Sequence, residues 1–259
     1  MGKERGGQPR ARHKKKARVD ELVVAQGLAQ DLKEAAALLL AGELLWGDQR
    51  LKSPGEKISS EATLRRRWRR GHRYVSRGGL KLEGALDHFH LDPRGRRCLD
   101  LGMSTGGFTD CLLQRGAAHV YGVDVGVGLA DARLVADPRV TILEGVNARA
   151  LSTELLPEPI ELCVADLSFT SLRKTIGAVL FCLAPAAELL LLVKPQFELE
   201  RAAVGEGGIV RDAAEQERAC REVAIALEAL GLQVSGWAPA QVKGAKGNQE
   251  HLLLAQWRQ

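Results

Sequence analysis

The order of apolar and polar positions divides the chain into two regions. In the first region, Val19–Gly27 and Asp31–Ala41 carry apolar residues at helical spacing. Glu43–Trp46 and Arg50–Leu51 then flank a Gly47-Asp48 turn. These patterns predict two helices followed by a short β-hairpin, about fifty residues in all.

From residue 79 onward, short apolar runs alternate with longer segments of helical spacing. The predicted strands are Arg97–Leu101, Val120–Val123, Val140–Leu143, Leu162–Ala165, Glu188–Val193, Gln233–Trp237 and His251–Gln256. The predicted helices lie near residues 80–89, 107–115, 171–183 and 212–230. This alternation indicates an α/β domain with a parallel sheet.

The last predicted connection, residues 238–250, lacks a helical pattern and contains Pro239, Gly244 and Gly247. A crossover between parallel strands needs a dozen or more residues, which are usually helical. We therefore expect the seventh strand to run antiparallel to the sixth. Its first residue would then lie at the carboxyl edge of the parallel strands.

Charge is distributed unevenly along the 259 residues. Residues 1–18 hold eight Lys or Arg residues against one Glu, in a chain whose net charge is +5. We expect this basic tail to be disordered, and either simply solvated or attracted to polyanions. A second basic cluster surrounds Trp68 and Tyr74, a composition suited to phosphate contact and base stacking. The predicted RNA-binding residues are Arg65, Arg66, Arg67, Arg69, Arg70, Arg73 and Arg77.

The remaining composition narrows the class of protein. The longest apolar runs, such as Leu189–Val193, are too short to cross a bilayer, and no apolar segment follows the basic N-terminus as in a signal peptide. The five cysteines form no C-x-x-C pair, and Cys98, Cys163 and Cys182 lie in apolar runs. We expect reduced, buried thiols, a cytoplasmic location and no metal site.

A glycine-rich turn follows the first strand of the α/β region. It runs G-x-x-x-G-G from Gly102, with Asp100 two residues before the first glycine. An acid there would repel a pyrophosphate but suits a cationic sulfonium, and a carboxylate, Asp124, ends the second strand. The order of turn, Asp124 and Asn147 predicts S-adenosylmethionine as cofactor. The predicted donor-binding residues are Asp100, Gly102, Ser104, Thr105, Gly106, Gly107, Phe108, Asp124 and Asn147.

Three charged residues are expected at the same edge of the sheet. Asp166 follows the fourth strand, Lys194 follows the fifth, and Glu250 precedes the seventh. Lys81 lies on the helix before the first strand. A lone Lys or Glu is usually a solvated charge, but three at one functional edge favour a catalytic cluster. A lysine there could accept a proton from a hydroxyl group, and the carboxylates would orient the lysines.

Two other methyl-transfer chemistries fit less well. Adenine N6 enzymes of the familiar kind carry [DNS]-P-P-[YF] after the fourth strand, where this chain has Asp166-Leu167-Ser168-Phe169. Cytosine C5 enzymes need a cysteine nucleophile near that edge. Cys163 lies inside the fourth strand and Cys182 inside a predicted helix, so neither is well placed.

Two resemblances add to this interpretation. Residues 19–66 resemble an S4 domain, a small RNA-binding module. Residues 19–259 resemble the TlyA, or hemolysin A, family of ribosomal RNA 2′-O-methyltransferases, which join an S4 domain to an FtsJ-like methyltransferase domain. The motifs that carry this second resemblance are Ser76–Lys81, Ser104–Asp110, Asn147–Arg149, Lys194–Glu198, Gly207–Asp212 and Gly247–Glu250.

The TlyA resemblance implies a catalytic tetrad of Lys81, Asp166, Lys194 and Glu250, which acts on a cytidine ribose of ribosomal RNA. It also implies a seven-stranded, Rossmann-like S-adenosylmethionine-dependent methyltransferase domain. We therefore expect a tail over residues 1–18, an S4-like domain over 19–66, an Arg-rich linker over 67–78 and a methyltransferase domain over 79–259. The competing hypotheses are a membrane-active hemolysin and an RNA-binding protein that has lost catalysis. The oligomeric state is left open.

Overall fold

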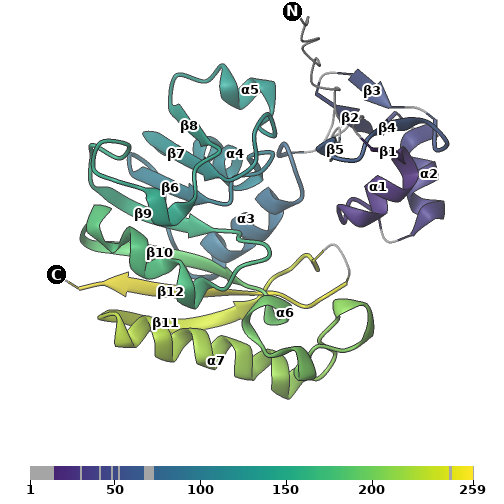
Figure 1. The fold of residues 1–259 in the computed structure, drawn as a ribbon. Helices are drawn as coiled ribbons and strands as arrows, with labels where there is room; N and C mark the ends of the chain where they lie inside the picture. The colour runs from purple at the N-terminus through teal and green to yellow at the C-terminus, as the bar shows by residue number, and fades with distance from the viewer. Residues whose placement is uncertain are drawn as a thin grey trace, which may run out of the picture. The chain divides into compact units, whose positions relative to one another are not determined.

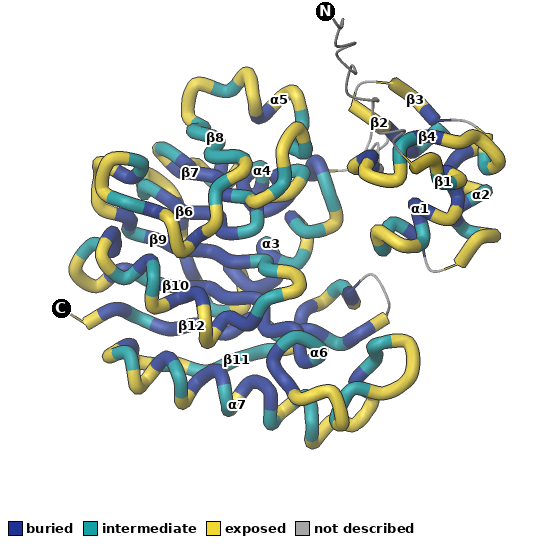
Figure 2. Tube along the Cα trace, viewed as in Figure 1, coloured by how far each residue is buried: buried dark blue, intermediate teal, exposed yellow. Residues whose placement is uncertain are grey.

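The computed structural model describes residues 15–29, 31–40, 42–47, 49–51, 53–66, 73–244 and 247–258. The chain divides into two compact units, residues 1–67 and residues 68–259. Each unit has its own hydrophobic core (Figures 1 and 2).

The first unit packs two helices against short strands. Helices α1 (Val19–Ala25) and α2 (Leu32–Leu40) contribute Val19, Val23, Ala35 and Leu39 to its core. The predicted hairpin is confirmed as β2 (Leu44–Trp46) antiparallel to β3 (Gln49–Leu51), with β5 (Leu64–Arg66) on the other side of β2. A second antiparallel pair joins β1 (Lys16–Arg18) to β4 (Lys57–Ser59).

Strand β1 corrects the predicted extent of the basic tail. Residues 16–18 were expected in the tail, but their backbone pairs in register with β4, from Lys16 opposite Ser59 to Arg18 opposite Lys57. The Arg18 Nη2 atom also lies 2.6 Å from Asp20 Oδ2. Backbone pairing does not depend on side-chain polarity, so a basic three-residue strand left no apolar signal in the sequence. The rest of the tail, residues 1–14, lies outside the described residues.

The second unit is built on a seven-stranded sheet, as predicted. Its strands are β6 (Arg97–Leu101), β7 (His119–Asp124), β8 (Val140–Glu144), β9 (Ile160–Ala165), β10 (Leu183–Val193), β11 (Leu232–Pro239) and β12 (His251–Trp257). Their order is β11-β12-β10-β9-β6-β7-β8. Strand β12 is antiparallel to both β10 and β11, which confirms the orientation predicted for the last strand.

Helices cover both faces of this sheet. The α-helices are α3 (Gly78–His88), α4 (Gly107–Gln114), α5 (Ala132–Val135), α6 (Pro195–Glu198) and α7 (Ala213–Ala229). Strand β10 contributes Leu190 and Leu192 to the core that includes α3 and α4, and Leu189, Leu191 and Val193 to the core that includes α7. This alternation explains why the strand reads as a continuous apolar run, since both of its faces are buried.

The helix predicted over residues 171–183 was wrong in type. The segment forms two 3₁₀ helices, η2 (Leu172–Lys174) and η3 (Ile176–Cys182), which are separated by Thr175. The Thr175 hydroxyl donates to the Ser171 carbonyl at 3.1 Å. Side-chain hydrogen bonds of this kind compete with a regular helix, and the first of these turns is further held by a buried carboxylate described below.

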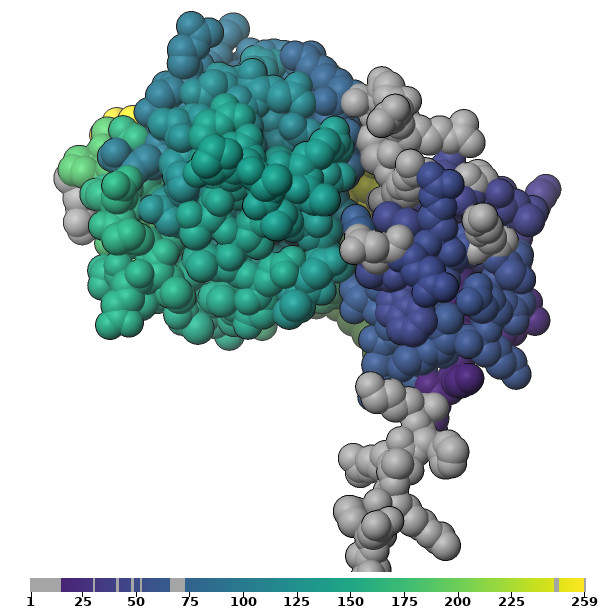
Figure 3. All heavy atoms as spheres, turned by 90° about the horizontal axis from the view of Figure 1, so that it is seen from above, coloured from purple at the N-terminus to yellow at the C-terminus, as the bar shows by residue number. Residues whose placement is uncertain are grey.

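The second unit begins earlier than residue 79. Tyr74 and Val75 are buried in the core with α3 and α4, and the Val75 amide donates to Asp110 Oδ2 at 2.7 Å. Residues 73–78 of the predicted linker therefore belong to this unit, and residues 67–72 lie outside the described part. In a space-filling view, the middle of the chain forms one broad face of the second unit (Figure 3).

Candidate active site

Four charged side chains from four separate segments form two ion pairs at the carboxyl edge of the sheet. Lys194 Nζ lies 2.6 Å from Asp166 Oδ1, which joins the ends of β10 and β9. Lys81 Nζ lies 2.5 Å from Glu250 Oε2, which joins the first turns of α3 to the start of β12. Each of the two predicted lysines is thus paired with one of the two predicted carboxylates.

These charges are largely withdrawn from water. The side chains of Lys194, Lys81 and Glu250 are 9%, 11% and 4% exposed, whereas Asp166 retains 24%. A buried charge is tolerated only when a partner compensates for its lost hydration. The two side chains of each pair therefore hold one another in place. Asp166, the most exposed of the four, is the member that most readily meets solvent or a ligand.

The two pairs lie close enough to act as one cluster. Burial raises the pKa of Asp166, but the charges of Lys194 and Lys81 together outweigh it and leave this pKa below its ordinary value. Asp166 is therefore a carboxylate at neutral pH, and Lys81 influences it in addition to its direct partner Lys194.

Local backbone geometry fixes Lys194. Pro195 occupies the first turn of α6, and Lys194 before it has φ −112° and ψ 101°. This confirms the extended backbone expected of a residue before proline. The Lys194 Nζ atom also donates to Ser168 Oγ at 2.8 Å and lies 5.9 Å from the centre of the Phe197 ring.

The glycine-rich turn lies next to this cluster. Gly102 has φ +82°, and a Cβ atom there would lie 2.6 Å from the Asp166 carbonyl oxygen. Only glycine combines the left-handed backbone with this close approach, because a side chain would clash with the loop after β9. The turn and Asp166 are therefore in direct contact.

Asp100 is completely buried beneath the turn. Its Oδ2 accepts hydrogen bonds from the Thr109 amide at 3.0 Å and the Thr109 hydroxyl at 2.7 Å. Its Oδ1 is buried without a hydrogen-bond partner in the described structure. Burial, with smaller contributions from Asp166 and Asp124, raises the pKa of Asp100 to about 7. An unpartnered buried oxygen costs free energy, and a cationic ligand nearby would relieve that cost.

Asp124 is the third carboxylate at this edge of the sheet, beside Asp100 and Asp166. Its Oδ2 accepts from the Ser104 amide at 2.8 Å and its Oδ1 from the Gly126 amide at 2.7 Å. Each oxygen keeps a second lone pair that can accept from a ribose hydroxyl. The three acids suit a cation and disfavour a pyrophosphate, in agreement with the ligand class expected from the sequence.

Other predicted donor residues have protein partners. A Cβ atom on Gly106 would overlap Leu134, and one on Gly107 would overlap the Ser76 hydroxyl. Phe108 is buried, whereas Ser104 and Asn147 are exposed and Thr105 is half-buried. The Asn147 carboxamide oxygen accepts from the Arg149 amide at 3.0 Å and caps η1 (Ala148–Ala150). Ligand contacts at these positions stay a prediction.

Sequence reasoning missed two residues beside the cluster. Phe169 is 89% exposed and has φ +63°, and its ring centre lies 5.4 Å from that of Phe197. Glu198 is a buried carboxylate whose Oε1 accepts from the Leu172 amide at 2.7 Å. The only sequence signals were an aromatic residue in the loop after Asp166 and an acid at the end of the Lys194 motif.

The predicted arginine cluster is divided between the two units. Arg65 lies on β5 and donates to the Gly47 carbonyl, and Arg66 lies on the same strand. In the second unit, Arg73 is paired with Glu83, and Arg77 is exposed at the start of α3. Arg67, Arg69 and Arg70 lie outside the described residues, and RNA binding by the cluster stays a prediction.

Comparisons with known proteins place the chain in a family. The model for FtsJ-like methyltransferases matches residues 74–257. The chain is 41% identical to the 16S/23S rRNA (cytidine-2′-O)-methyltransferase TlyA of Mycobacterium tuberculosis, over 92% of this chain and 89% of that protein. It is 35% identical to hemolysin A of Brachyspira hyodysenteriae, over 91% and 98%. The solved structure of a proposed hemolysin from Streptococcus thermophilus superposes with a TM-score of 0.76 at 36% identity, over 95% of this chain and 90% of that one. The chain therefore belongs to the TlyA, or hemolysin A, family of FtsJ-like methyltransferases.

Proposed function

We propose that this protein transfers a methyl group from S-adenosylmethionine to the ribose 2′-hydroxyl of a cytidine in ribosomal RNA. The observation that carries the proposal is the pair of lysine–carboxylate bridges beside the glycine-rich turn. The likeness to TlyA of Mycobacterium tuberculosis supports the choice of cytidine and ribosomal RNA.

The residues around the turn fit the donor. Asp124 would accept the ribose hydroxyls, and the unpartnered Oδ1 of Asp100 would face the positive charge of the ligand. S-adenosylmethionine supplies an electrophilic methyl group on a cationic sulfur. The carboxylates contribute by concentrating negative charge where that cation must lie.

Lys194 is the proposed proton acceptor. For this role Lys194 would first release its ammonium proton to solvent. As the oxygen–methyl bond forms and the sulfur–methyl bond breaks, the 2′-hydroxyl proton would then pass to the neutral Nζ atom, and S-adenosylhomocysteine would leave. Asp166 and Ser168 hold this nitrogen in place. Lys81, held by Glu250, would keep a second positive charge beside the developing oxyanion.

The test of this role compares three variants in methyl transfer to isolated ribosomal subunits. Lys194→Ala should keep its fold and donor binding but lose roughly 10²–10⁴-fold in rate, the contribution of a positioned base. Lys194→Arg should not restore activity, because a guanidinium does not release a proton at working pH. Lys174→Ala, an exposed lysine on η2, is the control. An active Lys194→Arg enzyme would mean that the residue acts only as a fixed charge.

The S4-like unit and the arginine cluster are proposed to bind the RNA, mainly through phosphates. Binding of the whole protein to ribosomal subunits should then weaken steeply with salt. A truncation should remove residues 1–72 rather than 1–78, because Tyr74 and Val75 belong to the core of the second unit. It should abolish subunit binding and retain donor binding. Full activity of the truncated protein would contradict this role.

The two competing hypotheses make different predictions. Within the described residues, no helix is long and apolar enough to cross a membrane. A membrane-active hemolysin would lyse cells without any methyl donor. An RNA-binding protein without catalysis would bind subunits but transfer no methyl group. A cytoplasmic location is part of the proposal, because the substrate is ribosomal RNA.

A further inference from the structure

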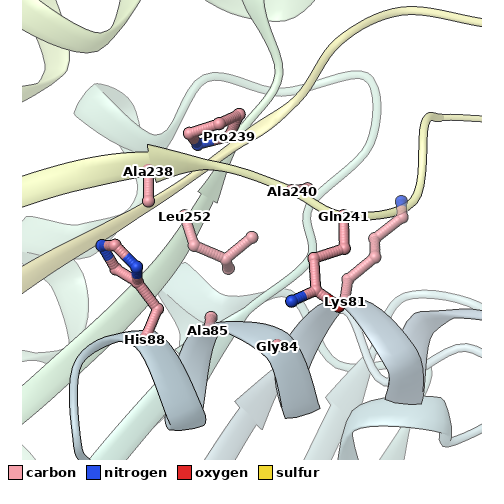
Figure 4. Close-up of a pocket in the computed structure, with 9 residues that line it drawn as sticks. All are labelled: Lys81, Gly84, Ala85, His88, Ala238, Pro239, Ala240, Gln241 and Leu252. Atoms are coloured by element: carbon pink, nitrogen blue, oxygen red, sulfur yellow. The ribbon is translucent and has the colours of Figure 1, made fainter.

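A pocket of about 200 Å³ opens between helix α3 and the chain that leaves β11. Gly84, Ala85 and His88 on α3 face Pro239, Ala240 and Gln241 across it (Figure 4). Lys81 stands at one end and His88 at the other. The walls are therefore mostly small and apolar, with polar groups at the ends.

The pocket shares Lys81 with the proposed active site. Lys81 lines it with its side chain, and the Nζ atom of the same residue pairs with Glu250. The opposite wall is joined to the same segment, because the Ala240 amide donates to the Glu250 carbonyl at 2.8 Å. The Gln249 side chain also donates to the Ala240 carbonyl at 3.0 Å. A group held here would be separated from the reacting cluster by no more than the length of the Lys81 side chain.

We propose that this pocket holds one unpaired nucleobase of the RNA strand whose ribose is methylated. The inference rests on the proposed function and adds a site for base recognition. Proteins that read RNA by sequence hold splayed bases against apolar surfaces and hydrogen-bond their edges. A slot lined by small residues admits the flat faces of a base, and its volume suits a single base rather than a stacked pair.

Two polar side chains of the lining, Gln241 on one wall and His88 at one end, provide the means of reading the base edge. The Gln241 carboxamide offers both donors and an acceptor, and within the described part of the chain it makes no hydrogen bond to another residue. The His88 imidazole, which is exposed, likewise offers a donor and an acceptor. A free anion is a poorer occupant, because the charge of Lys81 is already neutralised by Glu250.

Gly84 supplies a variant that alters the pocket lining without harming the fold. A Cβ atom there would lie 2.7 Å from the Gln241 side-chain carbon, the end of a flexible exposed side chain. The Gln241 side chain therefore packs against Gly84, and Gly84→Ala places a methyl group where the Gln241 carboxamide lies and displaces it. Alanine also forms helices better than glycine, so the folded state is not weakened. Gly177→Ala on η3 is the matched control, because its Cβ would make only ordinary contact with Leu230.

The experiment measures methyl transfer to ribosomal subunits and, separately, donor affinity by calorimetry. Gly84→Ala and Gln241→Ala should lower kcat/KM for RNA by about 5- to 100-fold, the range for losing a base-edge contact, with donor Kd unchanged. Gly177→Ala should match the wild type. Wild-type kcat/KM in both pocket variants, or an equal loss of donor affinity, would overturn the proposal. An inactive wild-type protein would instead count against the proposed function itself.

A second arm identifies the occupant. Ribosomal RNA substrates that carry a single abasic site at or beside the methylated nucleotide should lose activity with the wild-type protein. If the pocket holds the base that is missing at one of these positions, that substrate has already lost the contact. With that substrate, Gly84→Ala should therefore lower kcat/KM no further. If the fold-losses in kcat/KM from Gly84→Ala and from the abasic site multiply at every position, the pocket does not hold a base.

Discussion

Glu198 connects the two loops that carry the Lys194–Asp166 pair. Its Oε2 accepts from the Ser171 hydroxyl at 2.5 Å, and its Oε1 from the Leu172 amide at 2.7 Å. The Arg173 Nε atom lies 3.4 Å from Oε2. Glu198 lies at the end of α6, just after Lys194, whereas Ser171 and Leu172 follow the loop after Asp166. The carboxylate therefore sets the distance between these loops.

Removing this carboxylate should be costly. In Glu198→Ala, the Ser171 hydroxyl and the Leu172 amide lose their acceptor in a site where Glu198 is 4% exposed. Arg173 is exposed and keeps its ion pair with Glu222, so the cost comes mainly from the two stranded donors, at about 1–3 kcal/mol each. We expect a loss of about 2–6 kcal/mol in the free energy of unfolding.

Urea unfolding of the whole protein measures the stability loss, and methyl transfer at saturating donor measures its effect on the pair. Glu198→Gln keeps the shape and one acceptor, so it should fold well yet turn over more slowly than the wild type. Glu200→Ala is the matched control, because Glu200 is exposed and pairs with Arg218 at the surface. If Glu198→Ala unfolds at the same urea concentration as Glu200→Ala, the two loops are held by other contacts and the reasoning fails.

Three further predictions concern residues around the proposed donor and RNA sites. Asp124→Ala should weaken donor binding by about 1–3 kcal/mol in calorimetry, and unchanged affinity would refute its assignment. Phe169→Gly should raise the stability of the protein, because glycine adopts φ +63° without strain, and should weaken RNA binding by about 1–3 kcal/mol if the exposed ring stacks on a base. Burial raises the pKa of Asp100 from 3.8 to about 7, so the folded state binds this proton more tightly and stability falls as pH rises between those values. Asp100→Asn should flatten that part of the pH–stability curve in thermal unfolding; an unchanged curve would place the titration elsewhere.

The sheet and its last strand could be predicted from the sequence because each left a direct signal. The apolar run that ends at Val193 marks a strand buried on both faces, and both of its faces pack in the structure. The lack of a helix in residues 238–250 required an antiparallel return. The helix over 171–183 was predicted in the wrong form, because Glu198, distant in sequence, engages the Leu172 amide at its start.

The positions of Asp166, Lys194 and Glu250 at one edge also followed from the strand order, whereas Lys81 joined them only through the family resemblance. Their pairing did not, because Lys81 and Lys194 could each have faced either carboxylate. The sequence indicated only part of the role of the glycines in the glycine-rich turn. Gly106 and Gly107 were expected to admit the ligand, yet in the structure the space that they leave is taken by Leu134 and Ser76. A sequence shows that a side chain must be absent but not which neighbour requires it.

The burial of the tetrad decides how its variants are interpreted. Lys81 and Glu250 are both nearly excluded from water, so deleting either leaves a charge with no partner and no solvent. Loss of activity in such a variant could come from the unpaired buried charge, which disturbs the structure, or from the missing catalytic group. Lys194 differs, because its partner Asp166 keeps 24% of its side chain exposed and can be rehydrated when the lysine is removed. Among the four, Lys194 is therefore the position at which a loss of rate most directly reports chemistry.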